Sequence, residues 1–227
     1  IHAAHQHNVK VLLSIGGGSA SGNEKLKARY QTLLSENNRE MFAKSLIAYV
    51  KRHDFDGLDV DIEGPSITDA YGPFIEELAK VFKPEDKLLT AALSKGYGGA
   101  RVPNQAISRL DFLNIMAYDA AGSWNPDAPG QHSSLEFATT NVDYWIDRGL
   151  PKSKAVLGVP FYGYGFGDEF KNGGIGYDRI LAKHPGAELV DKTGSTIWYN
   201  GITTIKAKTK YAVEKQLGGI MIWSLDN

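Results

Sequence analysis

Strand-like and helix-like patterns of apolar residues alternate along almost the whole chain. One strand followed by one helix, repeated many times, is typical of parallel strands joined by crossover helices. The sequence therefore predicts an α/β fold. The six strand-like runs are Val9–Ile15, Phe55–Glu63, Lys87–Leu93, Leu110–Tyr118, Lys154–Pro160 and Gly219–Ser224.

Helices are predicted between these strands from apolar residues at helical spacing and from capping signals. A Gly-rich aromatic loop, Phe161–Gly176, is expected before a short helix and a hairpin around Thr193 and Gly194. In the last helix, the lysines fall at positions expected to be exposed. The four longer helices are one capped by Asn37 with Glu40 and carrying Phe42, Leu46, Tyr49 and Val50; one near Pro73–Phe82 with Phe74, Leu78 and Phe82 in step; one started by Ser133 with Glu136 and carrying Phe137, Tyr144 and Trp145; and one near Thr203–Gln216.

Composition narrows the class of protein without identifying it. The 227 residues, 42% hydrophobic and 22% charged, suit one globular domain over residues 1–227. The 25 basic residues nearly balance the 26 acidic ones and are scattered, which argues against a nucleic-acid partner. No apolar run approaches the roughly 20 residues of a membrane helix, so no membrane association is expected. The absence of cysteine excludes disulfides and thiolate chemistry.

The strand Phe55–Glu63 places three carboxyl groups on one side. Side chains alternate across a strand, so Leu58, Val60 and Ile62 share one face, and Asp59, Asp61 and Glu63, the acidic row, share the other. The apolar face suits packing under helices, which directs the acidic row into the interior. Buried carboxylates take up protons to avoid their charge, so at least one should have a raised pKa. A carboxyl group kept protonated near neutral pH can donate a proton in catalysis.

Two structural alternatives to this catalytic interpretation are a solvated acidic edge strand and a divalent-cation site. An edge strand would not carry a clean apolar row behind the acids. A metal site would need more oxygen ligands than the acidic row presents. His2, His5 and His7 lack matching carboxylates and are expected on a solvated helix, so no metal site is predicted.

Four stretches of the chain resemble motifs of the family-18 glycoside hydrolases. Asp56 and the acidic row match the Asp-x-x-Asp-x-Asp-x-Glu of that family, and the other stretches follow in the family's order. They are Ser14-Ile15-Gly16-Gly17, Met116-Ala117-Tyr118-Asp119 and Gly219–Trp223, with further similarity in the loop Tyr118–Trp124 and in Gly158–Tyr162. The resemblance covers Val9 to Trp223 and implies a (β/α)8 TIM barrel.

The strand count bears on how much of such a barrel is present. A closed barrel uses eight strands in roughly 250 residues, whereas six are predicted in this chain. By the resemblance these six correspond to barrel strands three to eight. We therefore expect the first two strands to be absent and the chain to be a fragment.

The resemblance also implies a mechanism. In the family the catalytic Glu protonates the glycosidic oxygen, and the substrate's own 2-acetamido carbonyl is the nucleophile, with net retention; this is the substrate-assisted exception to the two-carboxylate scheme. Glu63 is then the acid and later the base. Asp61 orients the acetamide and stabilises its developing charge, Asp59 keeps the shared proton count, and Tyr118 bonds the acetamide oxygen. No cofactor is implied.

Further residues are assigned by the same resemblance. Their expected roles are an apolar platform under the sugar for Trp223, contact with a sugar hydroxyl for Asp119, flanking-subsite contacts for Trp124 and Tyr162, a hydrogen bond to Asp59 for Ser14, and supporting positions behind the site for Asp56 and Met116. Alternatives stay open for some of them. The alternative role of Trp223 is to pack inside the end of the barrel, and that of Ser14 is to form a turn. The alternative role of Tyr164 and Phe166 is to stabilise their own loop by packing.

The expected function is hydrolysis of β-1,4 bonds between N-acetylglucosamine units, with an N-acetylglucosamine oligo- or polysaccharide as the partner. Alternatives are an endo-β-N-acetylglucosaminidase acting on N-linked glycans, a chitin-binding lectin without turnover, and a non-sugar barrel enzyme with a carboxylate metal site. The family also implies a secreted, periplasmic or cell-surface location, although the first residues lack the charged and apolar regions of a secretory signal.

Overall fold

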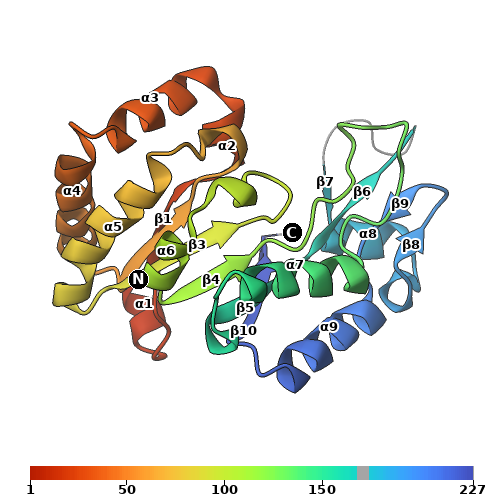
Figure 1. The fold of residues 1–227 in the computed structure, drawn as a ribbon. Coiled ribbons are helices and arrows are strands. Elements are labelled where there is room, and N and C mark those ends of the chain that lie inside the picture. The colour runs from red at the N-terminus through yellow and green to blue at the C-terminus, as the bar shows by residue number, and fades with distance from the viewer. Residues whose placement is uncertain (168–173, 227) are drawn as a thin grey trace. The chain divides into compact units, whose positions relative to one another are not determined.

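The computed structural model describes residues 1–167 and 174–226, and its strands and helices alternate as the sequence predicts (Figure 1). The chain divides into two compact units. The first comprises Ile1–Asn114 with Asp147–Leu150, and the second comprises Ile115–Ile146 with Pro151–Asn227.

Four strands form the sheet of the first unit, in the order β1, β2, β3, β4. The pairs β1–β2 and β2–β3 are parallel, as expected for strands joined by crossover helices. The strands are β1 (Leu12–Gly16), β2 (Gly57–Asp61), β3 (Leu88–Leu93) and β4 (Phe112–Ile115). The α-helices are α1 (His2–His5), α2 (Gly18–Gly22), α3 (Glu24–Leu34), α4 (Arg39–Arg52), α5 (Tyr71–Phe82) and α6 (Asn104–Arg109), and the short 3₁₀ helices are η1 (Gly64–Ser66), η2 (Lys83–Glu85) and η3 (Gly99–Arg101).

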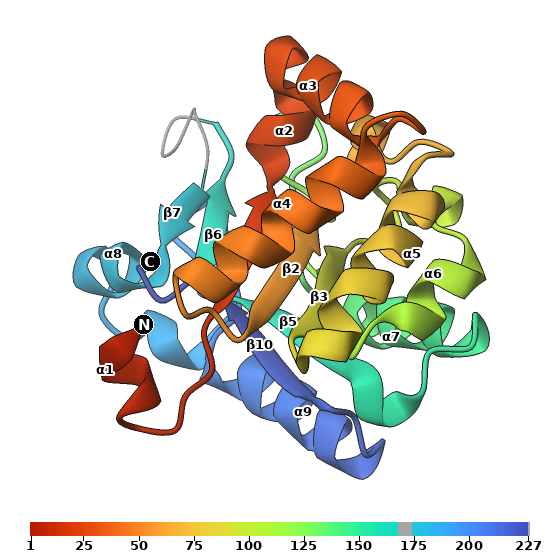
Figure 2. The same ribbon diagram turned by 90° about the vertical axis from the view of Figure 1, so that its left-hand side faces the viewer.

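Helices α4, α5 and α6 lie side by side along one face of these strands (Figure 2). The apolar side chains of β2 are completely buried, as predicted: Leu58, Val60 and Ile62. The predicted face of α5 is also confirmed, because Phe74, Leu78 and Phe82 have no exposed surface. Phe74 stacks on Phe42 of α4 at a centroid distance of 5.4 Å. The core of this unit therefore lies between β2 and the layer of helices.

Two details of α4 differ from the prediction. The residue before its first turn is Asn38, not Asn37, and the Asn38 side chain donates to the Thr32 carbonyl instead of capping α4. The apolar periodicity predicts Tyr49 on the buried face, but Tyr49 is 41% exposed, because Ala43, Leu46, Ile47 and Val50 fill that face. The apolar body of Tyr49 instead lies against the His53 ring.

Strand β2 is shorter than predicted and ends at Asp61 rather than at Glu63. Its neighbour β1 ends at Gly16, which is paired with Asp61, so the hydrogen-bonded ladder stops there. Gly16 has φ +111°, and a Cβ built on it would lie 2.1 Å from the Asp61 carbonyl oxygen, so only glycine allows this approach. Glu63 keeps an extended backbone with φ −122° and ψ 160°. The alternation of side chains therefore continues to Glu63.

The second unit combines a parallel strand pair with a small antiparallel sheet. Strand β5 pairs with β10 in parallel, and the small sheet has the order β7, β6, β9, β8. The strands are β5 (Ala155–Pro160), β6 (Tyr162–Gly165), β7 (Gly174–Gly176), β8 (Lys192–Thr193), β9 (Ile197–Trp198) and β10 (Gly219–Trp223). The helices are α7 (Leu135–Asp147), α8 (Tyr177–Lys183) and α9 (Ile202–Glu214), with 3₁₀ helices η4 (Lys152–Lys154) and η5 (Ala187–Leu189).

The small sheet corrects one prediction and confirms another. The sequence predicts a loop over Phe161–Gly176, but the described residues of this segment include β6 and β7, which pair antiparallel. Residues 168–173 of the segment lie outside the described residues. The predicted hairpin is present as β8 and β9. The small sheet packs against α8 through a cluster of buried apolar residues: Ile175, Ile180, Ala187, Ile197 and Tyr199. The sequence missed β6 because its Gly-rich, aromatic composition masks the strand pattern.

Two predictions about helices in this unit are wrong in detail. Helix α7 begins at Leu135, and the Oγ of Ser134 rather than Ser133 accepts from the Phe137 N–H, at 3.0 Å. Ser133 is instead fully buried. Lys208 of α9, expected to be exposed, is also fully buried, and its Nζ donates to the Ser133 carbonyl and Oγ and to Asn200 Oδ1 at 2.6–2.7 Å.

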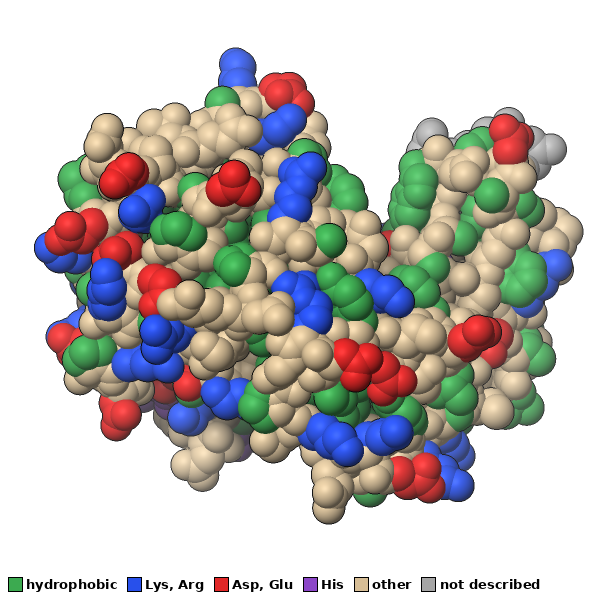
Figure 3. Space-filling view, viewed as in Figure 1, with side chains coloured by type: hydrophobic (Ala, Val, Ile, Leu, Met, Phe, Trp, Pro, Cys, Tyr) green, Lys and Arg blue, Asp and Glu red, His purple; other side chains and the backbone are tan. Residues whose placement is uncertain are grey.

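Basic and acidic side chains are interspersed on the face shown in Figure 3, without a large field of one sign. Among the described residues, no helix is long and apolar enough to cross a membrane.

Candidate active site

The acidic row lies at the end of β2 in the first unit, with its side chains on the face opposite the buried apolar one. All three residues are partly buried. Asp61 and Glu63 share a side-chain hydrogen bond. Asp61 is thus bonded to Glu63 and also feels the charge of Asp59, so the three carboxyl groups lie on one side of the strand, as its alternation predicts.

Asp59 is held at the inner end of the row by three donors. Thr90 Oγ1 of β3 and Asn114 Nδ2 of β4 donate to Asp59 Oδ1 at 2.6 and 3.2 Å, and Ser14 Oγ of β1 donates to Asp59 Oδ2 at 3.2 Å. The register of β1 against β2 pairs Ser14 with Asp59 directly. Burial raises the pKa of Asp59, and the three hydrogen bonds oppose that rise without cancelling it.

Asp61 is the carboxyl group most affected by its neighbours. Burial first, and then the charges of Glu63 and Asp59, raise the pKa of Asp61 to about 7. Its Oδ1 is buried and has no hydrogen-bond partner among the described residues. A carboxylate in this position is costly, so Asp61 holds a proton near neutral pH and can share it with Glu63. The predicted raised pKa is therefore present at Asp59 and Asp61.

The loop after β1 approaches the acidic row through glycines. The Gly17 N–H donates to the Asp61 carbonyl at 2.6 Å. A Cβ built on Gly17 would lie 3.8 Å from Asp61 Oδ2, and one on Gly18 would lie 3.9 Å from Glu63 Oε1. The absence of side chains at these two positions keeps space in front of the carboxyl groups.

Asp56 lies outside the acidic row, as predicted. Its Oδ2 accepts from the Val11 N–H at 2.7 Å and lies 2.8 Å from His5 Nε2. Burial acts to raise the pKa of Asp56, but the bonds from Val11 and His5 lower it below its usual value. Asp56 therefore joins the segment before β1 to the start of β2. His5 serves this contact, and within the described residues no group of three His, Cys, Asp or Glu is arranged to hold a metal ion.

A second group of polar residues gathers around Asp119 in the second unit. Asp119 Oδ1 accepts from the hydroxyls of Tyr162 at 2.5 Å and Tyr164 at 3.0 Å. Burial, and then the charge of Asp119, raise the pKa of the Tyr162 hydroxyl far above its usual value, so it stays a donor. The Asp119 N–H donates to Nδ1 of the buried His132 at 3.4 Å, and His132 Nε2 lies 3.3 Å from the Tyr162 carbonyl.

Met116 and Tyr118, just after β4, are both largely buried. The Tyr118 ring meets Tyr162 edge to face at 6.1 Å. A Cβ built on Gly158 of β5 would lie 3.0 Å from Tyr118 Cε1, so Tyr118 packs directly over that glycine. These contacts fix the side chain of Tyr118 within its own unit.

The remaining aromatic candidates differ in exposure. Trp124 is 61% exposed and meets the Tyr164 ring edge to face at 5.1 Å, and Trp223 at the end of β10 is 52% exposed. Tyr162, Tyr164 and Phe166 are buried. Trp124 and Trp223 therefore offer exposed aromatic surface, whereas the buried Tyr162 donates its hydroxyl hydrogen bond to Asp119.

The predicted site residues thus form two groups, one in each compact unit: Ser14 and the acidic row in the first, and Tyr118, Asp119 and Tyr162 in the second. Proximity of Asp61 to Tyr118 stays a prediction. Sequence reasoning missed Thr90 and Asn114, although each is a polar residue inside an otherwise apolar strand. It also missed Tyr30 of α3, whose hydroxyl bonds the Gly16 backbone; burial, and then the charge of Asp61, raise its pKa.

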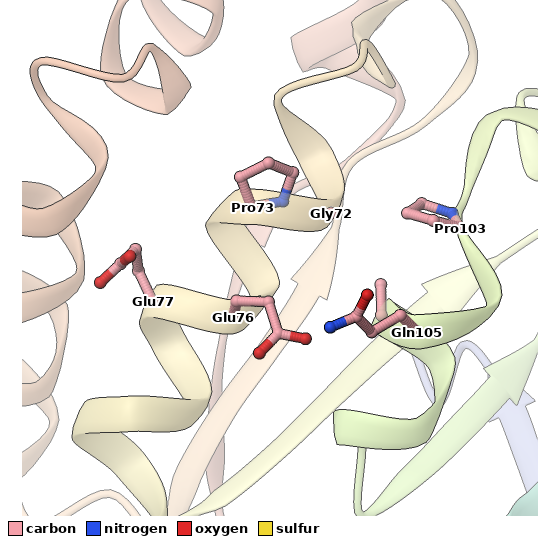
Figure 4. Close-up of a pocket in the computed structure, with 7 residues that line it drawn as sticks. Gly72, Pro73, Glu76, Glu77, Pro103 and Gln105 are labelled. Carbon is pink, nitrogen blue, oxygen red and sulfur yellow. The ribbon is translucent and has the colours of Figure 1, made fainter.

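A pocket of about 320 Å³ lies elsewhere, between α5 and α6. Glu76 and Gln105 face each other across it, while Glu77 points to the other side of α5 (Figure 4). It is lined by Gly72, Pro73, Glu76, Glu77, Pro103, Gln105 and Ala106. It contains no residue of the acidic row, and Arg109 already pairs with Glu76 at 2.8 Å, so we do not assign it to the chemistry of the row.

Comparison with known proteins adds independent findings. The chain matches the profile of Glycosyl hydrolases family 18 over residues 1–227. It is 30% identical to an endochitinase of Brugia malayi over 275 aligned positions, covering 96% of this chain and 53% of that protein. The chain thus spans about half the length of this relative.

Solved structures give the same fold. A chitinase from the chitin utilization locus of Flavobacterium johnsoniae matches with a TM-score of 0.89 and 37% identity, over 96% of this chain and 70% of that one. A chitinase of Cycas revoluta, solved in complex with (GlcNAc)3, matches with a TM-score of 0.80 and 27% identity, over 97% of this chain and 77% of that one. These matches confirm the predicted barrel fold class.

Proposed function

Because the chain belongs to glycoside hydrolase family 18, we propose that it forms the catalytic part of an enzyme that hydrolyses β-1,4 bonds between N-acetylglucosamine units by substrate-assisted, retaining catalysis. The observation that carries the proposal is the hydrogen-bonded pair of Asp61 and Glu63, with a pKa near 7 at Asp61. The named chitinases among the similar proteins, one of them bound to (GlcNAc)3, support this class of substrate.

Glu63 acts at the glycosidic oxygen in this mechanism. It donates its proton as the bond to the leaving sugar breaks, and the 2-acetamido carbonyl oxygen of the retained sugar attacks the anomeric carbon to give an oxazolinium ion. Glu63, now a carboxylate, takes a proton from the water that opens this ion. Protonation by a positioned side chain of this kind contributes typically 10²–10⁴-fold to the rate.

In this mechanism Asp61 stabilises positive charge on the substrate, and Asp59 influences the protonation of Asp61. Asp61 accepts a hydrogen bond from the acetamide N–H and stabilises the positive charge that develops on the oxazolinium ring. Asp59, fixed by Ser14, Thr90 and Asn114, supplies the negative charge that helps to keep a proton on Asp61. The acids titrate as a coupled group, so the pH profile belongs to the group.

We assign residues of the second unit to substrate contacts. Tyr118 donates to the acetamide oxygen, Asp119 contacts a sugar hydroxyl, and Trp223 packs under the sugar at the point of cleavage. The exposed surface of Trp223 and Trp124 supports contact roles for both. We also propose that the protein works outside the cytoplasm, where polysaccharides of this kind are met.

The decisive test compares Glu63→Gln with the parent chain on chitotetraose. We expect a loss of at least a hundredfold in kcat, because Gln keeps the shape of Glu but cannot donate the proton. Parent-like turnover by the variant would show that another residue is the acid. Tm is measured on both proteins, and Glu36→Gln, a change in the loop after α3, serves as the control.

Two further measurements separate the alternative functions. Release of glycan from an N-glycosylated protein, faster than cleavage of chitotetraose, would favour an endo-β-N-acetylglucosaminidase. Tight binding to chitin by the parent chain without any product would favour a lectin. Our proposal expects chitotetraose cleavage to dominate.

A further inference from the structure

The residue that follows Glu63 is covered by an aromatic ring from another loop. Gly64 has φ +51°, and a Cβ built on it would lie 2.2 Å from Cζ and 2.3 Å from Cε1 of Tyr97. The Tyr97 ring therefore occupies the space that a side chain at position 64 would take. The Gly64 N–H also donates to the Tyr97 carbonyl at 3.3 Å.

The loop that carries Tyr97 is fixed by close backbone contacts. It turns from Ser94 at the end of β3 to Gly98, and these two residues form a β-bridge. Gly98 has φ +88°, and a Cβ on it would lie 2.9 Å from both the N and the O of Gly64. Neither glycine tolerates a side chain, so the two segments approach each other as closely as backbones allow. Tyr97 is thereby held over Gly64, the residue that follows Glu63 in the sequence.

Tyr97 is nevertheless 48% exposed. One part of the ring packs on Gly64, the residue that follows Glu63, and much of the remaining surface is accessible. The other half-exposed tyrosine of this unit, Tyr49 on α4, is 41% exposed and lies against His53 and Phe55. Tyr97 therefore combines exposure, a fixed position and direct contact with the residue that follows the acid.

We propose that Tyr97 is a substrate-contacting residue, whose ring packs against the apolar face of a sugar next to the bond that Glu63 protonates. This inference rests on the proposed function. Sugar rings lie on both sides of the glycosidic oxygen, and in this proposal the exposed part of the Tyr97 ring, fixed over the residue next to the acid, packs on one of them. Aromatic rings provide large rigid contact area with little loss of conformational freedom, and their faces suit the C–H groups of a pyranose.

The test uses Tyr97→Leu and Tyr97→Phe with chitotetraose and chitohexaose. Leu keeps apolar bulk over Gly64 but removes the flat ring, and we expect KM to rise about tenfold with kcat changed less than threefold. Phe keeps the ring and should stay within threefold of the parent in KM. The pH profile should not move in either variant, because Tyr97 exchanges no proton. Tyr49→Leu is the matched control and should leave KM unchanged.

The outcomes separate this inference from the proposed function. If Tyr97→Leu keeps the parent KM while Glu63→Gln is inactive, the contact role of Tyr97 is wrong and the proposed function stands. If Glu63→Gln keeps its activity, the proposed function fails. Loss of kcat with a shifted pH profile in Tyr97→Leu would mean that Tyr97 acts only by positioning Glu63 through Gly64, which would overturn the inference. Tm identifies a variant that fails to fold, and Tyr97→Phe with Tyr97→Trp then carries the test: two aromatic variants with a tenfold higher KM would contradict it.

Discussion

At the scale of single residues, the acidic row that we propose for catalysis also lowers the stability of the folded chain. Three carboxyl groups follow one another on one side of β2, and their mutual repulsion adds to the loss of water around each. The alternation of a strand was enough to predict this arrangement. The donors that hold Asp59 were not predicted, because Thr90 and Asn114 come from β3 and β4, and only the pairing of strands brings them to β2.

Asp61 should make the folded chain less stable as the pH rises. Its pKa is about 7 in the folded chain and about 3.9 in the unfolded chain, so between these values the folded state binds more protons. The stabilising effect of that proton is complete below about pH 4 and is lost as the pH passes 7. Asp61→Asn removes this dependence. We expect it to raise the free energy of unfolding by about 1 to 3 kcal/mol at pH 8, after allowing for partial exposure, and to change it little at pH 4.

Urea unfolding of parent and Asp61→Asn at pH 4, 6 and 8 measures the difference. Glu77→Gln on α5, whose side chain pairs with Lys80 at 2.8 Å, is the control, and its effect should not grow with pH in this way. Equal stability of Asp61→Asn and the parent at pH 8 would mean that the acidic row carries no such cost. The same variant should lose activity, which is the expected opposition between stability and function at a catalytic site.

At the scale of elements, apolar periodicity predicted which strands and helices exist better than where they end. Strand β2 ends at Asp61 because its partner in β1, Gly16, is the last residue of that strand. Helix α7 starts after Ser134, which bonds the Phe137 N–H, because the hydroxyl of Ser133 bonds Lys208 instead. Such boundaries depend on partners distant in the sequence. Lys208 is the strongest example, since its three acceptors lie on Ser133 and Asn200.

Lys208 should give the second unit a stability that increases with pH. Burial lowers the pKa of Lys208 to about 7, whereas an unfolded Lys titrates near 10.4, so between these values the unfolded state binds more protons. Stability therefore rises from pH 7 to about pH 10, and below pH 7 the full cost of burying the cation remains. The three oxygen acceptors around Nζ favour the charged form and reduce this cost, so we expect a rise of about 1 to 3 kcal/mol.

Lys208→Met should remove the rise in stability between pH 7 and pH 10, whether the variant is more or less stable than the parent at any single pH. Lys210→Met on the same helix is the matched control, because the Lys210 side chain is 76% exposed and pairs with Glu214. Chemical unfolding at pH 7, 8.5 and 10 gives the slope for each protein. A slope in Lys208→Met as steep as in the control would contradict the assignment.

At the scale of the whole molecule, the apolar pattern of the sequence predicted the main strands and helices but not the small antiparallel sheet. Six parallel-type strands, their order and the helices between them were predicted from apolar runs and matched motifs, and the barrel class is confirmed by the solved chitinases. The small sheet around β6 was not predicted, since its strands are short and rich in glycine. The two groups of site residues lie in separate compact units, and the proposed mechanism needs both groups at one acetamide.

That requirement gives a prediction for Tyr118→Phe combined with Asp61→Asn. Each single change should lower kcat, Tyr118→Phe by about tenfold, because it removes one hydrogen bond to a group that becomes charged. If Tyr118 and Asp61 bind the same acetamide, removing one of them reduces the contribution of the other to catalysis. The fold-reduction in kcat of the double variant should then be smaller than the product of the two single reductions. Tyr211→Phe on α9, whose hydroxyl lies 3.4 Å from Asp143 on the surface, is the control, and its effect should multiply simply with that of Asp61→Asn. Simple multiplication for Tyr118 as well would mean that the two residues act independently, and a single acetamide held from both units would have to be abandoned.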